Sequence, residues 1–107
     1  MTEHPSAELD DVIHQRVRLG VLSILAQTRE ADFTYLRDTL GATDGNLGRH
    51  LDVLHEAGYV GLNRTFEGRR PRTWATITPK GRRALARHVR TLRAMLPEIA
   101  EPDRDGG

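Results

Sequence analysis

The chain has 107 residues, of which 37% are hydrophobic and 29% charged, with a net charge of +1 and no cysteine. This length allows one domain with one modest core, and the lack of cysteine excludes disulfides, thiolate metal sites and thiol catalysis. No apolar run approaches the roughly 20 residues that span a bilayer, and no charged-then-apolar segment opens the chain. We therefore expect a cytoplasmic protein without a membrane partner.

The small net charge hides a strong segregation of charge along the chain. Residues 1–48 carry four basic against eight acidic side chains, residues 49–93 carry eleven against three, and residues 94–107 carry one against four. Genomic base composition can account for the preference for arginine over lysine, but not for this segregation. Because arginine bonds bidentately to phosphates and guanine edges, the basic stretch favours a nucleic-acid partner.

The first predicted helix follows a flexible tail over residues 1–7 and opens a single domain over residues 8–99. Apolar residues recur at spacings of three and four from about Leu9 to Gln27, as in an amphipathic helix. They form two stripes on different sides, one through Ile13 and one through Val12. A helix that is apolar on two sides needs two partners, and a second subunit is a candidate for one of them.

A short connector over residues 31–34, at most a strand-like stub, leads into a brief helix over Tyr35–Leu40. Thr34 is the predicted N-cap of this helix, because its hydroxyl can accept a bond from the first free amides. Gly41 follows at the position where a left-handed C-cap residue belongs. The next helix lies only a few residues further on, so the two helices are joined by a tight turn.

The third helix is predicted to start at a cap formed by Thr43 or Asp44 and to end before Gly58. Leu47, Leu51 and Leu54 form its inward stripe, which leaves its N-terminal half exposed. Arginine can pair with guanine and asparagine with adenine, so Arg49 and Asn46 are the candidates for reading bases. The residues predicted to face DNA are Thr43, Asp44, Gly45, Asn46, Gly48, Arg49 and His50.

Some of these residues have simpler interpretations, which the sequence leaves open. Thr43, Asp44 and His50 are expected to touch phosphate or to cap the helix, and a purely structural role is equally open for Asp44 and His50. The two glycines each cost about 1 kcal/mol of helix stability relative to alanine. A helix that keeps them has a backbone that needs to approach another molecule closely.

Two β-rich segments, Val60–Phe66 and Thr73–Ile77, flank a tip over residues 67–72 and predict a hairpin. Three arginines crowd this tip: Arg69, Arg70 and Arg72. Neighbouring guanidinium groups repel one another unless an anion lies between them, and DNA phosphates or a narrow minor groove supply that anion. The alternative is a solvated turn.

The final helix is predicted over about residues 79–99, because Thr78 can cap it and Pro79 suits its first position. Pro97 should kink or end it, and residues 100–107 form an acidic tail. Its apolar stripe repeats like the a and d positions of a coiled coil, which suits packing on a second subunit or on its own core. The predicted dimer residues are Leu9, Val12, Ile13, Leu85, Val89, Leu92 and Leu96.

The order helix, helix, helix, hairpin, helix predicts a mainly α (α+β) fold, the winged helix-turn-helix. It would combine a three-helix core, a β wing of two or three strands and a long C-terminal dimerisation helix. The histidines at positions 4, 14, 50, 55 and 88 are too scattered to predict a metal site. No phosphate-binding glycine loop or nucleophile–base pair is present, so we expect neither a cofactor nor an enzyme.

Residues 14–81 resemble MarR-related and ArsR-like winged-helix regulators, and a small stand-alone subfamily most of all. The segments that match are HQRVRL at 14–19, ADFTYL at 31–36, TDGNL at 43–47, HL at 50–51, EAGYV at 56–60, GRRPRT at 68–73 and TPKG at 78–81. The resemblance implies sequence-specific operator binding by a homodimer, commonly with repression, and dimerisation through the first and last helices. Gly48 departs from the serine expected at its position.

The leading hypothesis is therefore a dimeric regulator that binds duplex DNA at a palindromic operator. Two alternatives stay open on the sequence: a winged helix that docks on another protein without affinity for DNA, and a binder of structured RNA. A small-molecule effector is also possible for such a regulator, but the sequence indicates no pocket for one.

Overall fold

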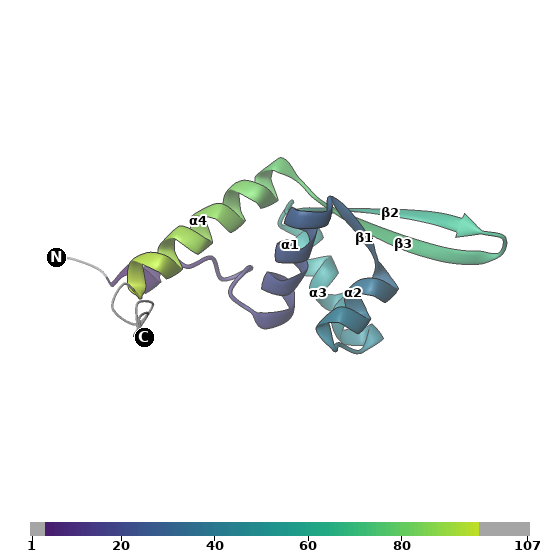
Figure 1. Ribbon diagram of the computed structural model, residues 1–107, viewed down its shortest axis with the longest axis horizontal. Coiled ribbons are helices and arrows are strands. Elements are labelled where there is room, and N and C mark those ends of the chain that lie inside the picture. Colours follow the sequence, from purple (N-terminus) through teal and green to yellow (C-terminus); the bar gives the residue numbers. More distant parts are fainter. Residues whose placement is uncertain (1–3, 97–107) are drawn as a thin grey trace, which may run out of the picture.

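The computed structural model describes residues 4–96, which form five helical segments and one small sheet (Figure 1). The sheet is antiparallel with the strand order β1-β3-β2. This is the winged helix-turn-helix architecture that the element order predicted. The elements are η1 (Pro5–Glu8), α1 (Arg16–Thr28), β1 (Glu30–Asp32), α2 (Phe33–Leu40), α3 (Asp44–Glu56), β2 (Val60–Glu67), β3 (Arg70–Ile77) and α4 (Pro79–Met95).

The core lies where α1, α2 and α3 meet the base of the sheet. The predicted inward stripe of α3 is confirmed, because Leu47 and Leu54 are fully buried and Leu51 nearly so. They pack in one cluster with Leu22 of α1 and Leu36 of α2. The β2–β3 hairpin and α4 extend from this core in opposite directions, so each has a surface that the core does not cover (Figure 1).

The helix predicted from Leu9 begins only at Arg16, and this correction has a local cause. The Asp10 carboxylate accepts bonds from the backbone N–H groups of Val12 and Ile13, at 2.9 and 3.3 Å, and so holds a turn there. Ile13 then enters the core and is fully buried. It is therefore not exposed for a dimer interface, contrary to the prediction from its helical stripe.

The helix α2 begins at Phe33, two residues earlier than predicted, and its N-cap is Asp32 rather than Thr34. The Asp32 carboxylate accepts the Tyr35 N–H at 2.8 Å. The left-handed C-cap predicted at Gly41 is confirmed, with φ of 64°. The connector before α2 does form a strand, β1, which pairs with β3 and makes the sheet three-stranded.

The hairpin is longer than predicted, since only Gly68 and Arg69 lie between β2 and β3. Arg70 and Arg72 are therefore strand residues and not part of the tip. Pro71 is tolerated in β3 because β1 pairs only with Trp74–Thr76, so at Pro71 the strand has a neighbour on one side alone.

The start of α4 agrees with the prediction: Thr78 is the N-cap and accepts the Gly81 N–H at 2.9 Å, and Pro79 occupies the first turn. A Cβ added at Gly81 would lie 2.2 Å from the Tyr59 carbonyl oxygen, so α4 approaches the chain there too closely for any side chain. The helix ends at Met95, with Leu96 as its C-cap, so it is shorter than the predicted span to residue 99. Pro97 and the predicted acidic tail lie outside the described residues.

At the other end of the chain, residues 1–3 of the predicted tail lie outside the described residues, and Pro5–Glu8 form η1, which packs against α4. The predicted domain boundaries stay predictions. Among the helices of residues 4–96, none combines the length and the hydropathy that a membrane crossing requires.

Candidate nucleic-acid interface

The exposed face of α3 is the first half of the candidate interface. Thr43 caps the helix by accepting the Asn46 N–H at 3.1 Å, which orients the first turn toward solvent. Asn46 and Arg49 are exposed, with Arg49 opposite the buried leucines and Asn46 on the flank of the helix. The two side chains predicted to read bases are thus held on a rigid helix and are free to contact another molecule.

Gly45 and Gly48 leave the helix surface bare between these side chains. An added Cβ at either position would meet nothing within 4 Å, so packing within the described chain does not require glycine there. Glycine in a helix costs about 1 kcal/mol relative to alanine. The backbone of α3 is uncovered by side chains at these two positions.

His50 differs from the prediction, because it is buried with only 8% of its surface exposed. A guanidinium N–H of Arg18, on α1, donates to its Nδ1 at 3.1 Å. Burial lowers the pKa of His50, and the charges of Arg18 and Arg49 lower it further, so the ring is neutral. His50 joins the first and third helices within the subunit, which corrects its predicted exposure toward DNA.

Asp44 also has a partner inside the subunit. Arg37 of α2 donates to it at 2.9 Å and to Asp38 at 2.9 Å, and these bonds raise the pKa of Arg37. The Asp44 carboxylate lies in the first turn of α3, where the helix dipole favours a negative charge. The geometry thus agrees with a structural role for Asp44, linking the two helices of the helix-turn-helix.

The wing, β2 and β3, carries four arginines: three that were predicted to contact DNA and Arg64 of β2, which is exposed and was not predicted. Arg69 and Arg70 are exposed, and no ion pair within residues 4–96 involves either of them. Arg72, by contrast, binds Asp32 at 2.7 Å and Glu67 at 2.5 Å and stacks on the Trp74 ring, 4.7 Å from its centre. Of the three predicted wing contacts, two are free cations and one is held in the subunit.

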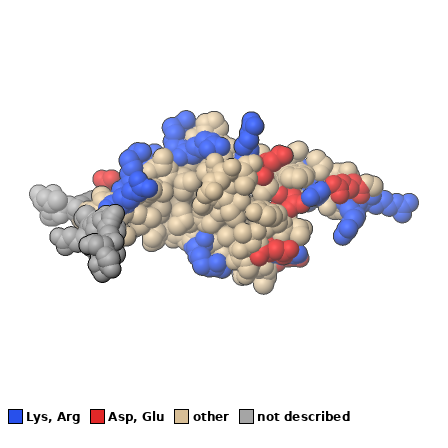
Figure 2. Space-filling view, in the orientation of Figure 1, with Lys and Arg blue, Asp and Glu red and all other residues tan. Residues whose placement is uncertain are grey.

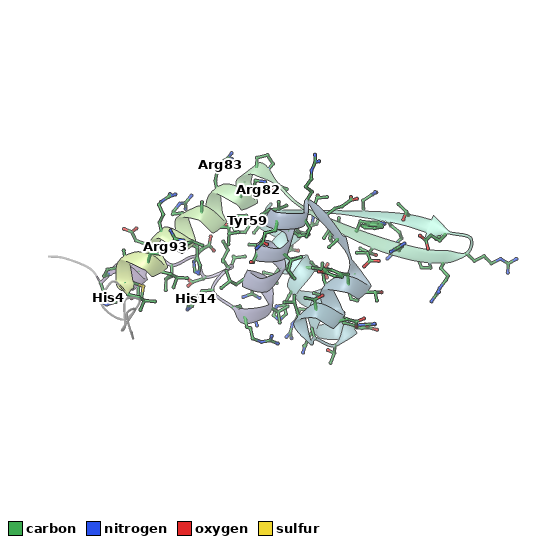
Figure 3. The ribbon with its side chains drawn as sticks, in the orientation of Figure 1. His4, His14, Tyr59, Arg82, Arg83 and Arg93 are labelled. Atoms are coloured by element: carbon green, nitrogen blue, oxygen red, sulfur yellow. The ribbon has the colours of Figure 1, made fainter. Side chains whose placement is uncertain are left out.

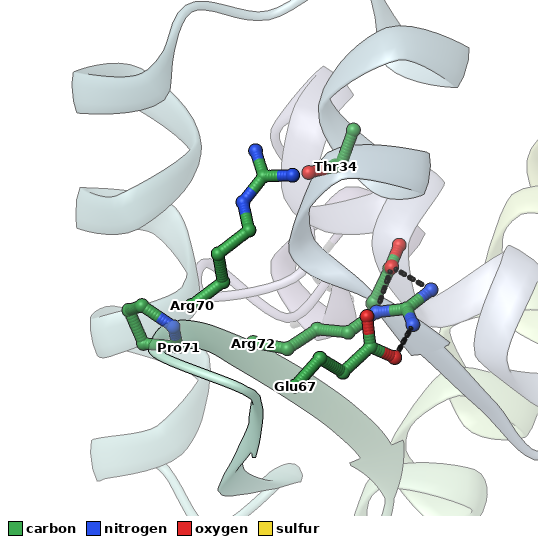
Figure 4. Close-up of a pocket in the computed structure, with 6 residues that line it drawn as sticks. Thr34, Glu67, Arg70, Pro71 and Arg72 are labelled. Carbon is green, nitrogen blue, oxygen red and sulfur yellow. Dashed lines mark hydrogen bonds and ion pairs between the residues drawn. The ribbon is translucent and has the colours of Figure 1, made fainter.

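A hollow of about 360 Å³ separates the wing from the start of α2 (Figure 4). Arg70 extends across it toward Thr34, while Arg72 turns to Asp32 and Glu67 on the other side (Figure 4). A neighbouring hollow reaches Asp44 at the start of α3. The exposed turn of α3, the start of α2 and the wing therefore border one concave surface that carries a free arginine.

Figure 2 shows basic side chains at the free end of the wing and along α4, with acidic side chains over the part of the wing nearer the core. Two acidic residues, Glu67 and Asp32, are paired with Arg72. Arg69 and Arg70 place exposed positive charge at the free end of the wing.

Comparison with known proteins shows the family. Residues 17–96 match the family described as "Winged helix DNA-binding domain". The chain belongs to this family. It is 35% identical over 78 residues to an uncharacterized protein of Methanocaldococcus jannaschii. The matched region covers 73% of this chain and 85% of that protein.

Two solved structures support the same assignment of this winged helix domain. A transcriptional regulator homologue from Pyrococcus horikoshii OT3 has 31% identity and a TM-score of 0.76, over 84% of this chain and 89% of that one. The transcriptional repressor CouR, bound to a 23-mer DNA duplex, has 27% identity and a TM-score of 0.73, over 96% and 71%. Structural neighbours also include a MarR-family regulator. The predicted resemblance to DNA-binding transcriptional regulators is confirmed, and this kinship implies a non-enzymatic role. The MarR-family neighbour, at 21% identity, shows a shared fold.

Six of the seven predicted dimer residues keep some exposed surface. Leu85, Val89 and Leu92 of α4 are half-buried, and Leu96 is 37% exposed. Leu9 and Val12, in the segment before α1, are also half-buried. A shallow pocket between α1 and α4 has an apolar floor and an arginine rim, lined by Ala26, Leu85, Ala86, Val89, Arg82, Arg90 and Arg93.

Three side chains that organise this winged helix domain were missed by the sequence analysis: Arg18, Arg37 and Asp32. Each makes its bond across elements, so no local pattern marks it. The only local signal was at Asp32, since aspartate is as good an N-cap as threonine. Within residues 4–96, no three histidine or carboxylate side chains gather closely enough to hold a metal ion.

Proposed function

We propose that this chain is a sequence-specific transcription regulator that inserts the N-terminal half of α3 into the major groove of duplex DNA. The observation that carries the proposal is the bare helix surface at Gly45 and Gly48, flanked by the exposed Asn46 and Arg49. An arginine and an asparagine on such a surface can reach guanine and adenine edges, because the backbone between them does not hold the DNA away.

The wing supplies the contacts that do not depend on sequence. Arg69 and Arg70 are exposed cations at the outer end of the hairpin, and they fit the phosphates or the narrow minor groove beside the site that α3 reads. Arg72 sets the shape of the wing through Asp32 and does not contact DNA itself. Binding therefore combines base contacts from α3 with backbone contacts from the wing.

The functional unit in this proposal is a homodimer. A second copy packs on the half-exposed stripe of Leu85, Val89, Leu92 and Leu96, with Leu9 and Val12 at its edge. A two-fold axis between the subunits would match a palindromic operator with half-sites about one helical turn apart. Repression follows if the operator overlaps a promoter, and the DNA-bound repressor CouR supports this mode for the fold.

Selection of bound sequences from random duplex DNA, followed by binding measurements on three variants, tests the proposal. Arg49→Ala should abolish the preference for the selected sequence, and Arg70→Ala should weaken binding to every duplex by a similar factor. Arg83→Ala is the matched control, because it removes the same charge from α4, away from the wing (Figure 3). If Arg49→Ala and Arg70→Ala bind like Arg83→Ala, the assigned roles are wrong. Equal competition by duplex RNA would favour an RNA target instead.

A further inference from the structure

The segment over residues 10–14, called the strap below, is fastened to α4 by a buried histidine. His88 lies on the inner side of α4 and is 1% exposed. Its Nδ1 accepts the backbone N–H of Asp10 at 3.2 Å, so the proton of the neutral ring is on Nε2. Nε2 in turn faces Nδ1 of His14 at 3.4 Å and donates to it. Figure 3 labels His14 where the strap passes close to α4.

The same strap is also fastened to the start of β2. Tyr59 donates its hydroxyl proton to Oδ2 of Asp10 at 2.6 Å, while Oδ1 of this carboxylate holds the turn at Val12 and Ile13. Burial and this bond raise the pKa of Tyr59 to about 12, so the phenol stays protonated. Asp10 therefore ties three parts of the chain together.

From the strap, the hydrogen bonds continue to the proposed DNA-reading helix. The Val12 carbonyl accepts Nε–H of Arg18 at 2.5 Å, and the other end of the same guanidinium donates to His50 of α3 at 3.1 Å. His50 is next to Arg49, the candidate for reading guanine. An unbroken series of bonds thus runs from α4 through the strap and Arg18 to α3.

We propose that Arg18 is a positioning residue for α3, and that the strap couples it to α4 in a way that acid releases. Only the effect on DNA binding rests on the proposed function, because the bonds themselves exist in the free protein. With the strap in place, Arg18 is held at both ends and fixes the rotation of α3 about its axis. With the strap released, the Val12 carbonyl leaves Arg18 and α3 loses this restraint.

Acid acts on the strap because the bond from the Asp10 N–H requires an unprotonated Nδ1 on His88. A proton added at this nitrogen would face the Asp10 N–H, so the two donors would repel each other. The groups around His88 are Asp10 and His14 on the strap, Tyr59 behind Asp10, and Arg87 on its own helix. Burial and the neighbouring His14 lower the pKa of His88, against the opposing effect of the Asp10 carboxylate.

The direction of the pH effect follows from this lowered pKa. Below about 6.5, the ordinary pKa of histidine, the unfastened ring binds more protons than the fastened one. The fastened strap is therefore most stable above this pH and becomes less stable as the pH falls below it. His50 behaves in the same way, since burial and Arg18 lower its pKa too.

This prediction has the opposite sign to the ordinary effect of acid on DNA binding. Histidines that gain charge normally strengthen the attraction to phosphates. A loss of affinity between pH 7.5 and 5.5 would thus point to a structural device, and its dependence on His88 would identify the strap.

The first test measures binding to a selected duplex by fluorescence anisotropy at pH 7.5 and 5.5, at one ionic strength. The wild type should bind the duplex more weakly at pH 5.5 than at pH 7.5. His88→Asn keeps an oxygen acceptor for the Asp10 N–H but does not titrate, so it should lose less affinity than the wild type, and the loss that remains comes from His50, the other acid-sensitive partner of Arg18. His55→Asn, which removes a histidine on the exposed side of α3, is the control and should behave like the wild type. An equal loss in His88→Asn would overturn the proposal.

Arg18→Lys tests the positioning role, because lysine keeps the charge but cannot bond Val12 and His50 together. It should weaken binding to the selected duplex more than to a random duplex, and its affinity should no longer fall with acid. If Arg18→Lys keeps both the preference and the pH profile of the wild type, Arg18 does not position α3.

A second readout in the free protein separates this proposal from the proposed function. The NMR signal of the Arg18 Nε–H should shift between pH 7.5 and 5.5 in the wild type and shift less in His88→Asn, where only His50 still responds to acid. If the signal behaves in this way but the protein binds no duplex in the anisotropy measurements, the proposed regulator function is wrong and the proposal about the strap still holds. If His88 titrates and the Arg18 signal does not move, the strap is wrong, whatever the protein binds.

Discussion

Asp32 and Arg72 join the wing to the helix-turn-helix through a single carboxylate. Its Oδ2 accepts Nε–H of Arg72 at 2.7 Å, while its Oδ1 accepts the Tyr35 N–H at 2.8 Å and so caps α2. The wing therefore cannot change its inclination without disturbing the start of α2. This pair holds the two DNA-facing parts of the proposed interface in one fixed relation.

Removing this carboxylate should destabilise the fold through the cap and the wing together. Asp32→Ala should lower the free energy of unfolding by about 1 kcal/mol from the lost N-cap, and further from the lost partner of Arg72. Asp32→Asn should cost less, because its amide oxygen can still cap α2. Urea denaturation measures both. Asp38→Ala removes an exposed ion-paired carboxylate of α2 and is the control; an equal effect of Asp32→Ala and Asp38→Ala would contradict this role.

The Asp32 carboxylate should also make the free energy of unfolding depend on pH in acid. The Tyr35 N–H, and then Arg72, lower the pKa of Asp32 below its ordinary 3.8 despite burial. The unfolded chain therefore binds more protons just below pH 3.8, so this contribution is present above that pH and is lost as the pH falls below it. Unfolding measured between about pH 2.5 and 5 should show a flatter acid limb for Asp32→Asn than for the wild type. Parallel curves would rule out a lowered pKa at Asp32.

Replacing the glycines of the exposed α3 face with alanine should raise the stability of the fold and lower the affinity for DNA. Gly45→Ala and Gly48→Ala should each stabilise the protein by up to about 1 kcal/mol, since the added methyl group meets nothing and favours the helix. Both should weaken binding to duplex DNA, because the methyl group lies between the helix and the groove. Thermal unfolding and anisotropy measure the two effects.

Gly81→Ala is the matched control for these two variants. Its added Cβ would meet the Tyr59 carbonyl, so it should destabilise the fold. If Gly45→Ala and Gly48→Ala bind duplex DNA as tightly as the wild type, this face of α3 does not approach DNA closely.

The parts of the fold that depend on local signals could be predicted from the sequence. The Leu47, Leu51 and Leu54 stripe, the left-handed Gly41 and the Thr78 cap each follow from a few neighbouring residues, and all three are confirmed. The segregation of charge also pointed to the correct class of protein, because residues on the third helix and the hairpin are close in sequence as well as in space.

What the sequence could not predict depends on contacts between distant residues. The periodic stripe through Ile13 indicated a helix from Leu9, but Asp10 bonds to its own turn and to Tyr59, and the helix begins only at Arg16. The helical wheel placed His50 outside, whereas Arg18 draws it in. Arg72 resembled the other wing arginines until β1 brought Asp32 beside it. Side-chain partners across elements thus decided which predicted site residues are free.

Dimerisation through α4 should fail when a charge enters its apolar stripe. Leu92→Glu should sediment as a monomer, because a carboxylate would be buried between the two subunits without a partner. Leu96→Glu changes a more exposed residue of the same stripe, so it should give the same result with less effect on folding. Arg83→Glu, elsewhere on α4, is the control and should keep the wild-type state. An unchanged dimer in both leucine variants would exclude this face.

The salt dependence of binding to duplex DNA tests the central claim most directly, because it counts the phosphates that the α3 face and the wing contact together. If each subunit neutralises about four phosphates, the logarithm of the affinity should fall against the logarithm of salt concentration with a slope of about −3.6 per subunit. Arg70→Ala should reduce this slope by about 0.9 per subunit. A purified protein that shows no salt-sensitive binding to any duplex would contradict the account.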